Sequence, residues 1–167
     1  MARRIPHSSS YPQPVARVHA ALTSEGYWRD RIAEAGGEHA RVDRVDVGEA
    51  TIAVEMTQTI PAEQLPSIVT KIRPGDLEIS RTEDWGPLAG DRATGTFTAR
   101  VAGLPGELTG TLTLDGDATG ATVTLDGRVQ VSLPLIGGKV EAVIADRIEE
   151  LLRHEDEFTA AWLSGNK

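Results

Sequence analysis

Cysteine is absent from the 167-residue chain, and aromatic residues make up only 4% of it. Without cysteine the chain has no disulfide bond, no thiolate metal ligand and no thiol nucleophile, which fits a reducing compartment. No stretch approaches the roughly 18 apolar residues that a membrane helix needs. The residues that follow Arg3 and Arg4 do not form the apolar core of an export signal. We therefore expect a cytoplasmic protein without stable membrane insertion.

Positive charge is also scarce. The chain has 17 basic and 25 acidic residues, so its formal net charge is -8, and the basic residues are scattered. This balance argues against nucleic acid and anionic lipid surfaces as partners. The length corresponds to one domain spanning residues 1–167, large enough to bury a core without covalent cross-links. The residues do not indicate an oligomeric state.

Two helices are predicted after an N-terminal strand. Residues 3–10 read as the strand, and two prolines then open a helix with apolar residues at helical spacing over residues 15–22. A second helix is expected from Ser24, a suitable N-cap, to the Gly36-Gly37 pair. The chain thus begins with a strand and a helix pair.

From residue 38 the pattern changes to a period of two, which is typical of strands with unlike faces. Threonines alternate with apolar or small residues, as in the stretch 94–99. Turn sequences, such as Arg73-Pro74-Gly75-Asp76, separate about six such strands. The pattern predicts an antiparallel sheet with one hydrated, threonine-lined face and one apolar face.

A long helix is expected at the C-terminus, roughly from Ile136 to Leu163. Its apolar stripe has steps of four and three residues, so one face is buried. At about 1.5 Å per residue the helix is near 40 Å long, which indicates that it crosses a strongly curved sheet. The stripe consists of Val140, Ile144, Ile148, Leu151, Phe158 and Trp162.

Three segments carry a family resemblance: Arg3 to Pro14, the strand end Glu83-Asp84-Trp85, and the helix entrance from Pro134 to Glu141. With this order of elements, the chain resembles the helix-grip superfamily of START lipid-transfer domains, birch-pollen-allergen-like proteins and polyketide cyclases (SRPBCC), and within it a bacterial branch of unknown function. The resemblance implies an α+β fold in which a curved antiparallel sheet of about seven strands surrounds the C-terminal helix. It also implies an apolar cavity between sheet and helix, but no particular activity.

Small residues on the apolar face of the sheet, such as Gly95, Ala99 and Gly110, have three explanations: a close helix, a bend of the strands, or a void. The resemblance favours a void that holds a ligand. We expect its apolar lining to consist of Val54, Met56, Ile79, Trp85, Phe97, Ala99, Leu112, Val140, Ile144 and Ile148.

Three polar residues, His7, Arg81 and Glu155, fall on faces that otherwise read as apolar. In one interpretation, water solvates all three: His7 lies at a frayed strand start, Arg81 extends from a sheet edge, and Glu155 lies beyond the rim of the sheet. Alternatively, Arg81 and Glu155 face the cavity and either pair together or bind the polar end of an apolar ligand. His7 with Glu155 is a candidate acid/base pair. We retain both interpretations.

The segment between Ile60 and Pro74 departs from strand spacing and predicts a short amphipathic helix. It either closes one end of the core or acts as a lid over a ligand entrance. The acidic run from Asp115 to Asp126 fits a calcium loop loosely, but its flanks predict a hairpin. We expect no metal and no cofactor. Arg147 and His154 are interpreted as a solvated helix edge.

Three functional hypotheses follow. The first is a binding or carrier domain for a small hydrophobic, lipid-like or polyketide-like ligand. The second is a cyclase or aromatase in which Arg81, Glu155 and His7 act on a substrate in the same cavity. The third is a protein-interaction module, which a fully packed interior would favour. The sequence does not decide whether the protein is an enzyme, and it indicates neither ligand nor pathway.

Overall fold

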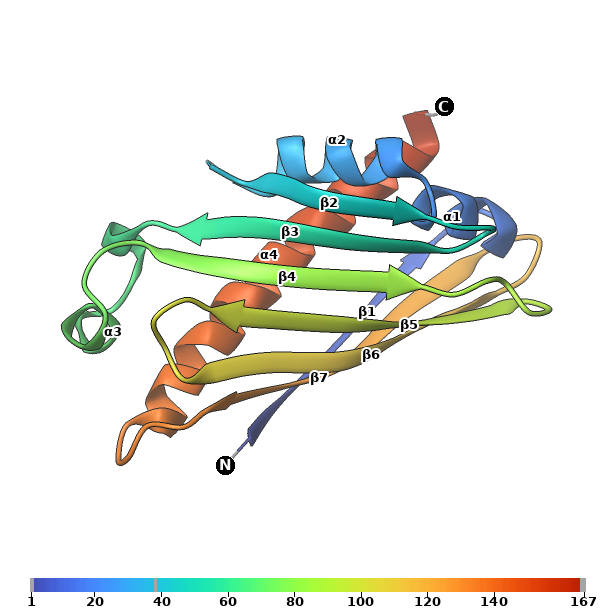
Figure 1. Ribbon diagram of the computed structural model, residues 1–167. Helices are drawn as coiled ribbons and strands as arrows, with labels where there is room; N and C mark the ends of the chain where they lie inside the picture. The colour runs from blue at the N-terminus through green and yellow to red at the C-terminus, as the bar shows by residue number, and fades with distance from the viewer. Residues whose placement is uncertain (1, 38, 166–167) are drawn as a thin grey trace.

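The computed structural model describes residues 2–37 and 39–165 and confirms the predicted α+β helix-grip architecture (Figure 1). A strand, two helices, six further strands and a long C-terminal helix follow one another as expected. The elements are β1 (Ala2–Tyr11), α1 (Val15–Leu22), α2 (Glu25–Ala35), β2 (Arg41–Val47), β3 (Ile52–Ile60), the 3-10 helix η1 (Ala62–Gln64), α3 (Ser67–Ile72), β4 (Leu77–Trp85), β5 (Arg92–Val101), β6 (Gly106–Gly116), β7 (Ala121–Val131) and α4 (Gly137–Gly165).

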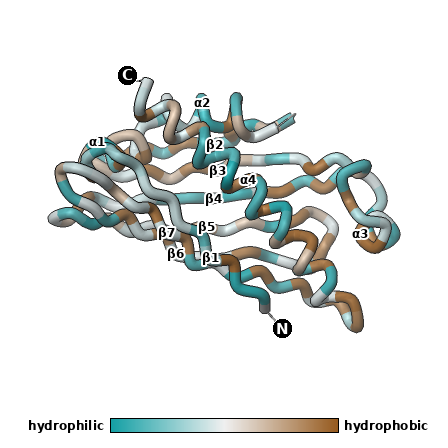
Figure 2. The backbone as a smooth tube through the Cα atoms, turned by 180° about the vertical axis from the view of Figure 1, so that it is seen from behind, coloured by the Kyte–Doolittle hydropathy of each residue, from teal (hydrophilic) through white to brown (hydrophobic). Residues whose placement is uncertain are grey.

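The strands form one antiparallel, seven-stranded sheet in the order β1-β7-β6-β5-β4-β3-β2. Strands β2 to β7 follow one another as a meander, and β1 pairs with β7, so the N-terminal strand forms one edge of the sheet. Helix α4 crosses one face of this sheet diagonally (Figure 1). Seen from behind, its outward side is largely hydrophilic (Figure 2). No helix in the described part of the chain is long and apolar enough to cross a membrane.

The alternation predicted for the strands separates the two faces of the sheet. On the outer face, exposed Thr96 lies opposite exposed Thr111. On the inner face, buried Phe97 and Leu112 lie opposite glycines of the neighbouring strand, Gly110 and Gly95. On the inner face, the large side chains of Phe97 and Leu112 therefore cover the two glycines, which have no side chain of their own.

Gly95 and Gly110 do not mark empty space. A Cβ atom on Gly95 would overlap the Asp84 carbonyl oxygen of the paired strand. A Cβ atom on Gly110 would lie 3.0 Å from both the Asp126 oxygen and the Gly127 Cα. Of the three explanations open for these glycines, a void is thus wrong. The neighbouring strands approach so closely that only glycine fits, as expected where a sheet is strongly coiled.

Helix α2 packs against the C-terminal half of α4 through aromatic side chains. The ring of fully buried Tyr27 lies 5.5 Å from Trp28 and 5.3 Å from Trp162, both edge-on. Its hydroxyl group is 2.6 Å from the Thr159 hydroxyl. The aromatic residues therefore dock α2 on α4, beside β2 and β3 at one edge of the sheet.

Candidate ligand-binding pocket

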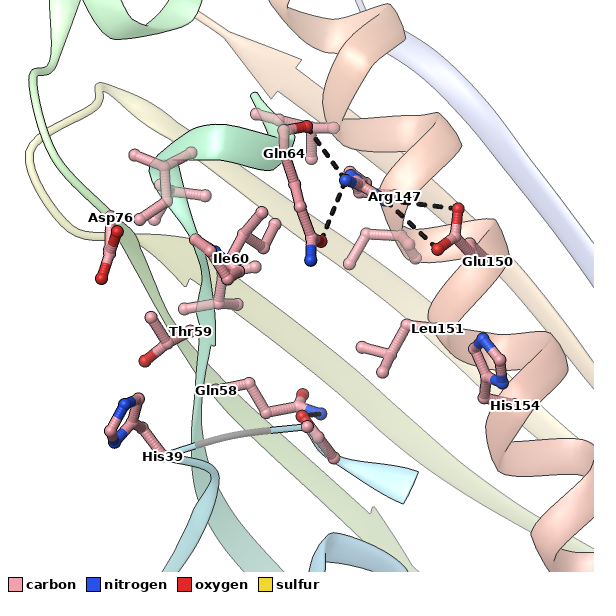
Figure 3. A pocket seen from close by; sticks show the side chains of 18 of the residues that line it. His39, Gln58, Thr59, Ile60, Gln64, Asp76, Arg147, Glu150, Leu151 and His154 are labelled. Carbon is pink, nitrogen blue, oxygen red and sulfur yellow. Dashed lines mark hydrogen bonds and ion pairs between the residues drawn. The ribbon is translucent and has the colours of Figure 1, made fainter. Parts of the chain in front are cut away.

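A pocket of about 470 Å³ opens at one end of the molecule, between α4, the ends of β3 and β4, and the η1 segment (Figure 3). Its apolar wall comes from the sheet and from one face of α4: Ile60, Leu77, Ile79, Val101, Ile144, Ile148 and Leu151. Its polar groups include His39, Gln58, Thr59, Glu63, Gln64, Asp76, Arg147, Glu150 and His154.

The pocket forms because the chain leaves the sheet between β3 and β4. Pro61 follows the last residue of β3, and the detour through η1 and α3 returns to the sheet at Leu77. On α4, the residues Ile144, Ile148 and Leu151 are four and three positions apart, so their side chains lie on one face of the helix. The pocket is thus bordered by the detour on one side and this helical face on the other.

Arg147 joins the detour to α4. Its Nη2 atom donates to the Gln64 carbonyl oxygen at 2.9 Å and to the Gln64 Oε1 atom at 3.0 Å. Its Nη1 atom is 3.2 Å from Glu150 Oε1 (Figure 3). Arg147 and His154, expected to form a solvated helix edge, both border the pocket, and the His154 side chain is largely exposed. His39 was missed as well, because a loop position carries no periodic signal.

A buried charge cluster lies deeper between the sheet and α4. Glu155 Oε2 is 2.6 Å from Arg81 Nη1, and Glu155 Oε1 is 2.5 Å from Arg31 Nη2. All three residues are less than 10% exposed. The interpretation in which water solvates Arg81 and Glu155 is therefore wrong, because the two side chains pair with each other inside the protein. Arg31 was missed, although it lies directly before Ile32 on the buried face of α2.

A second buried carboxylate, Glu83, lies 4.0 Å from Arg31 and accepts a hydrogen bond from Trp85 Nε1 at 3.0 Å. Burial raises the pKa of Glu83, and the attraction of Arg31 and Arg81 only partly opposes it. Burial also acts to raise the pKa of Glu155, but the adjacent guanidinium groups outweigh it and lower that pKa to about 2. Glu155 is thus the strongly ionised member of the cluster.

A cavity of only about 50 Å³ adjoins the cluster, bordered by Arg31, Glu83 and Glu155. This is the volume of one or two water molecules. His7 borders it too, but its Nε2 atom lies 2.5 Å from Asp156 Oδ2. That hydrogen bond raises the pKa of His7 although burial acts to lower it. In the candidate acid/base pair of His7 and Glu155, each group has another direct partner: His7 is hydrogen-bonded to Asp156, the residue after Glu155 on α4, and Glu155 pairs with Arg31 and Arg81.

The residues predicted to line one cavity are distributed over several sites. Ile79, Ile144 and Ile148 line the large pocket. His7, Trp85, Phe97, Leu112 and Glu155 line the small cavity. Ala99 borders a void of about 10 Å³. The remaining four are buried and line none of these spaces: Val54, Met56, Arg81 and Val140.

Direct packing and the charge cluster therefore divide the expected interior hollow. Gln58 lines the large pocket and accepts a 2.6 Å hydrogen bond from Arg81, which in turn binds Glu155 at the small cavity. The cluster consequently separates the two spaces. Of these two spaces, the large pocket of about 470 Å³ has room for an organic molecule, and the small cavity of about 50 Å³ does not.

The acidic run near residue 117 is a hairpin turn between β6 and β7. Asp117 Oδ1 accepts hydrogen bonds from the backbone N–H groups of Thr119 at 2.8 Å and Gly120 at 3.1 Å. The hydrogen bond from the Thr119 hydroxyl group, together with these two, lowers the pKa of Asp117. In the described part of the chain, no group of three or more histidine, aspartate or glutamate side chains has a geometry that could hold a metal ion.

A seven-stranded antiparallel meander with β1 at one edge, packed around a long C-terminal helix and leaving a pocket between them, is the helix-grip fold. More narrowly, the chain belongs to the family described as "Protein of unknown function (DUF2505)", which matches residues 6–163.

Known proteins resemble the chain over nearly its whole length. The uncharacterized protein Rv0481c of Mycobacterium tuberculosis is 33% identical over 173 residues, covering 99% of each chain. Among solved structures, the Zhui aromatase/cyclase from Streptomyces sp. R1128 has a TM-score of 0.59 at 11% identity and covers 100% of both chains. Truncated norcoclaurine synthase from Thalictrum flavum has a TM-score of 0.56 at 10% identity, covering 100% of this chain and 96% of that one. At these identities the two structures show the shared fold alone.

Proposed function

We propose that the protein binds a small, mainly apolar molecule in the large pocket. The observation that carries this proposal is the pocket itself, whose volume of about 470 Å³ lies within the range of roughly 300–1,000 Å³ typical of small-molecule sites. Its wall of aliphatic side chains favours an apolar guest, because transfer of that guest from water contributes about 25 cal/mol per Å² of buried apolar surface. Polar groups at the mouth would orient it.

A cyclase or aromatase activity is the second candidate, and the name of the Streptomyces neighbour is what favours it. The residues expected to carry such chemistry do not support it. Arg81 and Glu155 bind each other, and His7 binds Asp156, at positions outside the large pocket. The imidazoles that border the large pocket are His39 and His154. Because neither of the expected acid/base groups reaches the pocket, we favour binding or transport over catalysis.

The proposal is tested with the neutral fluorophore N-phenylnaphthylamine, whose emission rises in apolar surroundings. We expect the wild-type protein to bind it and native mass spectrometry to detect a co-purified small molecule. Leu151→Trp places a large ring in the pocket, since Leu151 lines it and is partly exposed. This variant should bind at least tenfold more weakly than wild type.

Val143→Trp is the matched control, because Val143 is also a partly buried residue of α4 but lines none of the three cavities described. It should bind the fluorophore like wild type. Equal loss of binding in both variants, or no binding by the wild-type protein, would overturn the proposal.

A further inference from the structure

One polar side chain, Gln58 on β3, lies deep in the large pocket. It is only 3% exposed and belongs to the pocket wall. In the close view it lies between His39 on one side and Leu151 of α4 on the other (Figure 3). A buried amide in an otherwise apolar wall is costly unless its hydrogen-bonding groups find partners. The partners of Gln58 therefore indicate what the pocket can accept.

The buried charge cluster determines which way this amide points. A guanidinium group has N–H donors and no acceptor, so the Gln58 atom that lies 2.6 Å from Arg81 Nη1 must be the carbonyl oxygen Oε1. Arg81 cannot turn away, because the same Nη1 atom also donates to Glu155 Oε2 at 2.6 Å. The amide NH₂ group of Gln58 is consequently directed away from the cluster.

This NH₂ group is incompletely paired. One N–H donates to the Gly36 carbonyl oxygen over a long distance of 3.4 Å, and the other has no partner among the described residues. The deep end of the pocket thus presents a hydrogen-bond donor, with the Arg81–Glu155 ion pair behind it. A guest that brings an acceptor oxygen would satisfy the donor, whereas an ammonium group has no lone pair with which to accept from it.

We propose that Gln58 makes the pocket selective for apolar molecules that carry an sp² oxygen acceptor, such as a ketone, ester or carboxylate, at their inner end. This inference rests on the proposed function and adds to it the chemical class of the ligand. Gln58 is the specificity-determining residue, and Arg81 with Glu155 positions it.

The test compares three guests that share a naphthalene ring: acetylnaphthalene, ethylnaphthalene and naphthylethylamine, each competing against N-phenylnaphthylamine. The first two differ in shape by little more than a carbonyl oxygen. One additional buried hydrogen bond should make acetylnaphthalene bind about fivefold more tightly than ethylnaphthalene. The protonated amine should be the weakest of the three.

Gln58→Glu tests the residue itself. The new carboxylate still accepts from Arg81, so the cluster keeps its partner, but no N–H faces the pocket. We expect the fivefold preference to disappear while ethylnaphthalene still binds, which also shows that the variant is folded. Gln64→Glu is the matched control, because Gln64 also lines the pocket and also accepts from an arginine, yet its side chain is exposed. It should keep the preference.

Each result has a distinct meaning. Equal binding of acetylnaphthalene and ethylnaphthalene by the wild-type protein overturns this inference but leaves the proposed function standing. A preference that survives in Gln58→Glu also overturns it. If neither the fluorophore nor any naphthalene binds, the proposed function fails and the inference fails with it. The comparison of guests in the wild-type protein needs no variant, so misfolding of Gln58→Glu does not prevent refutation.

Discussion

Replacement by glutamine should affect the stability of the protein differently at Glu155 and at Glu83, the two buried glutamates of the charge cluster. Glu155→Gln removes the charge that Arg31 and Arg81 share, and leaves two buried guanidinium groups without it. Since one pKa unit corresponds to about 1.4 kcal/mol, the lowering of the Glu155 pKa from 4.5 to about 2 corresponds to about 3 kcal/mol. We therefore expect Glu155→Gln to lose about 3 kcal/mol of unfolding free energy at neutral pH, and to melt about 6–12 °C lower.

The lowered pKa of Glu155 also predicts how the stability of the protein depends on pH. A carboxylate with a lowered pKa stabilises the folded state fully above its unfolded pKa, and this contribution is lost as the pH falls through the folded pKa. The difference in stability between wild type and Glu155→Gln should therefore shrink between about pH 4.5 and pH 2. Urea unfolding followed by circular dichroism over this range measures it.

Glu83→Gln is the matched control, because Glu83 belongs to the same cluster and is equally buried. Its pKa is raised by burial, so the ionised form costs stability at pH values above its folded pKa. Glutamine resembles the protonated form and can still accept the Trp85 hydrogen bond. We expect Glu83→Gln to be at least as stable as wild type at neutral pH. Equal destabilisation by both substitutions would refute this account of the cluster.

Two further predictions concern the sheet and the pocket rim. Gly95→Ala should destabilise the protein by about 2 kcal/mol, because the new Cβ atom would overlap the Asp84 carbonyl oxygen. An unchanged midpoint of urea unfolding would contradict the conclusion that only glycine fits at this position. Arg147→Ala should change the free energy of unfolding by less than about 1 kcal/mol. It should accelerate amide hydrogen exchange in residues 62–72, because the hydrogen bonds from Arg147 to Gln64 are lost. Equally faster exchange in the rest of the protein would contradict the view that Arg147 holds only this segment.

The amino-acid sequence determined the order and type of the secondary-structure elements. Alternating threonines predicted strands with one hydrated face, and the stripe from Val140 to Trp162 predicted a long helix buried on one side. Both patterns are local, because side-chain direction in a strand or helix follows directly from its period. The same patterns put Arg81 and Glu155 on faces that otherwise read as apolar but left open whether they are solvated, and in the structure both are buried.

Tertiary structure alone decided where space remains inside the protein and which groups face it. Arg31, Arg81 and Glu155 come from a helix, a strand and a second helix, so their meeting depends on how α2 and α4 dock on the sheet. The orientation of the Gln58 amide depends in turn on that meeting. No sequence period encodes such contacts, because packing between distant segments determines both the remaining volume and the partner of each buried polar group.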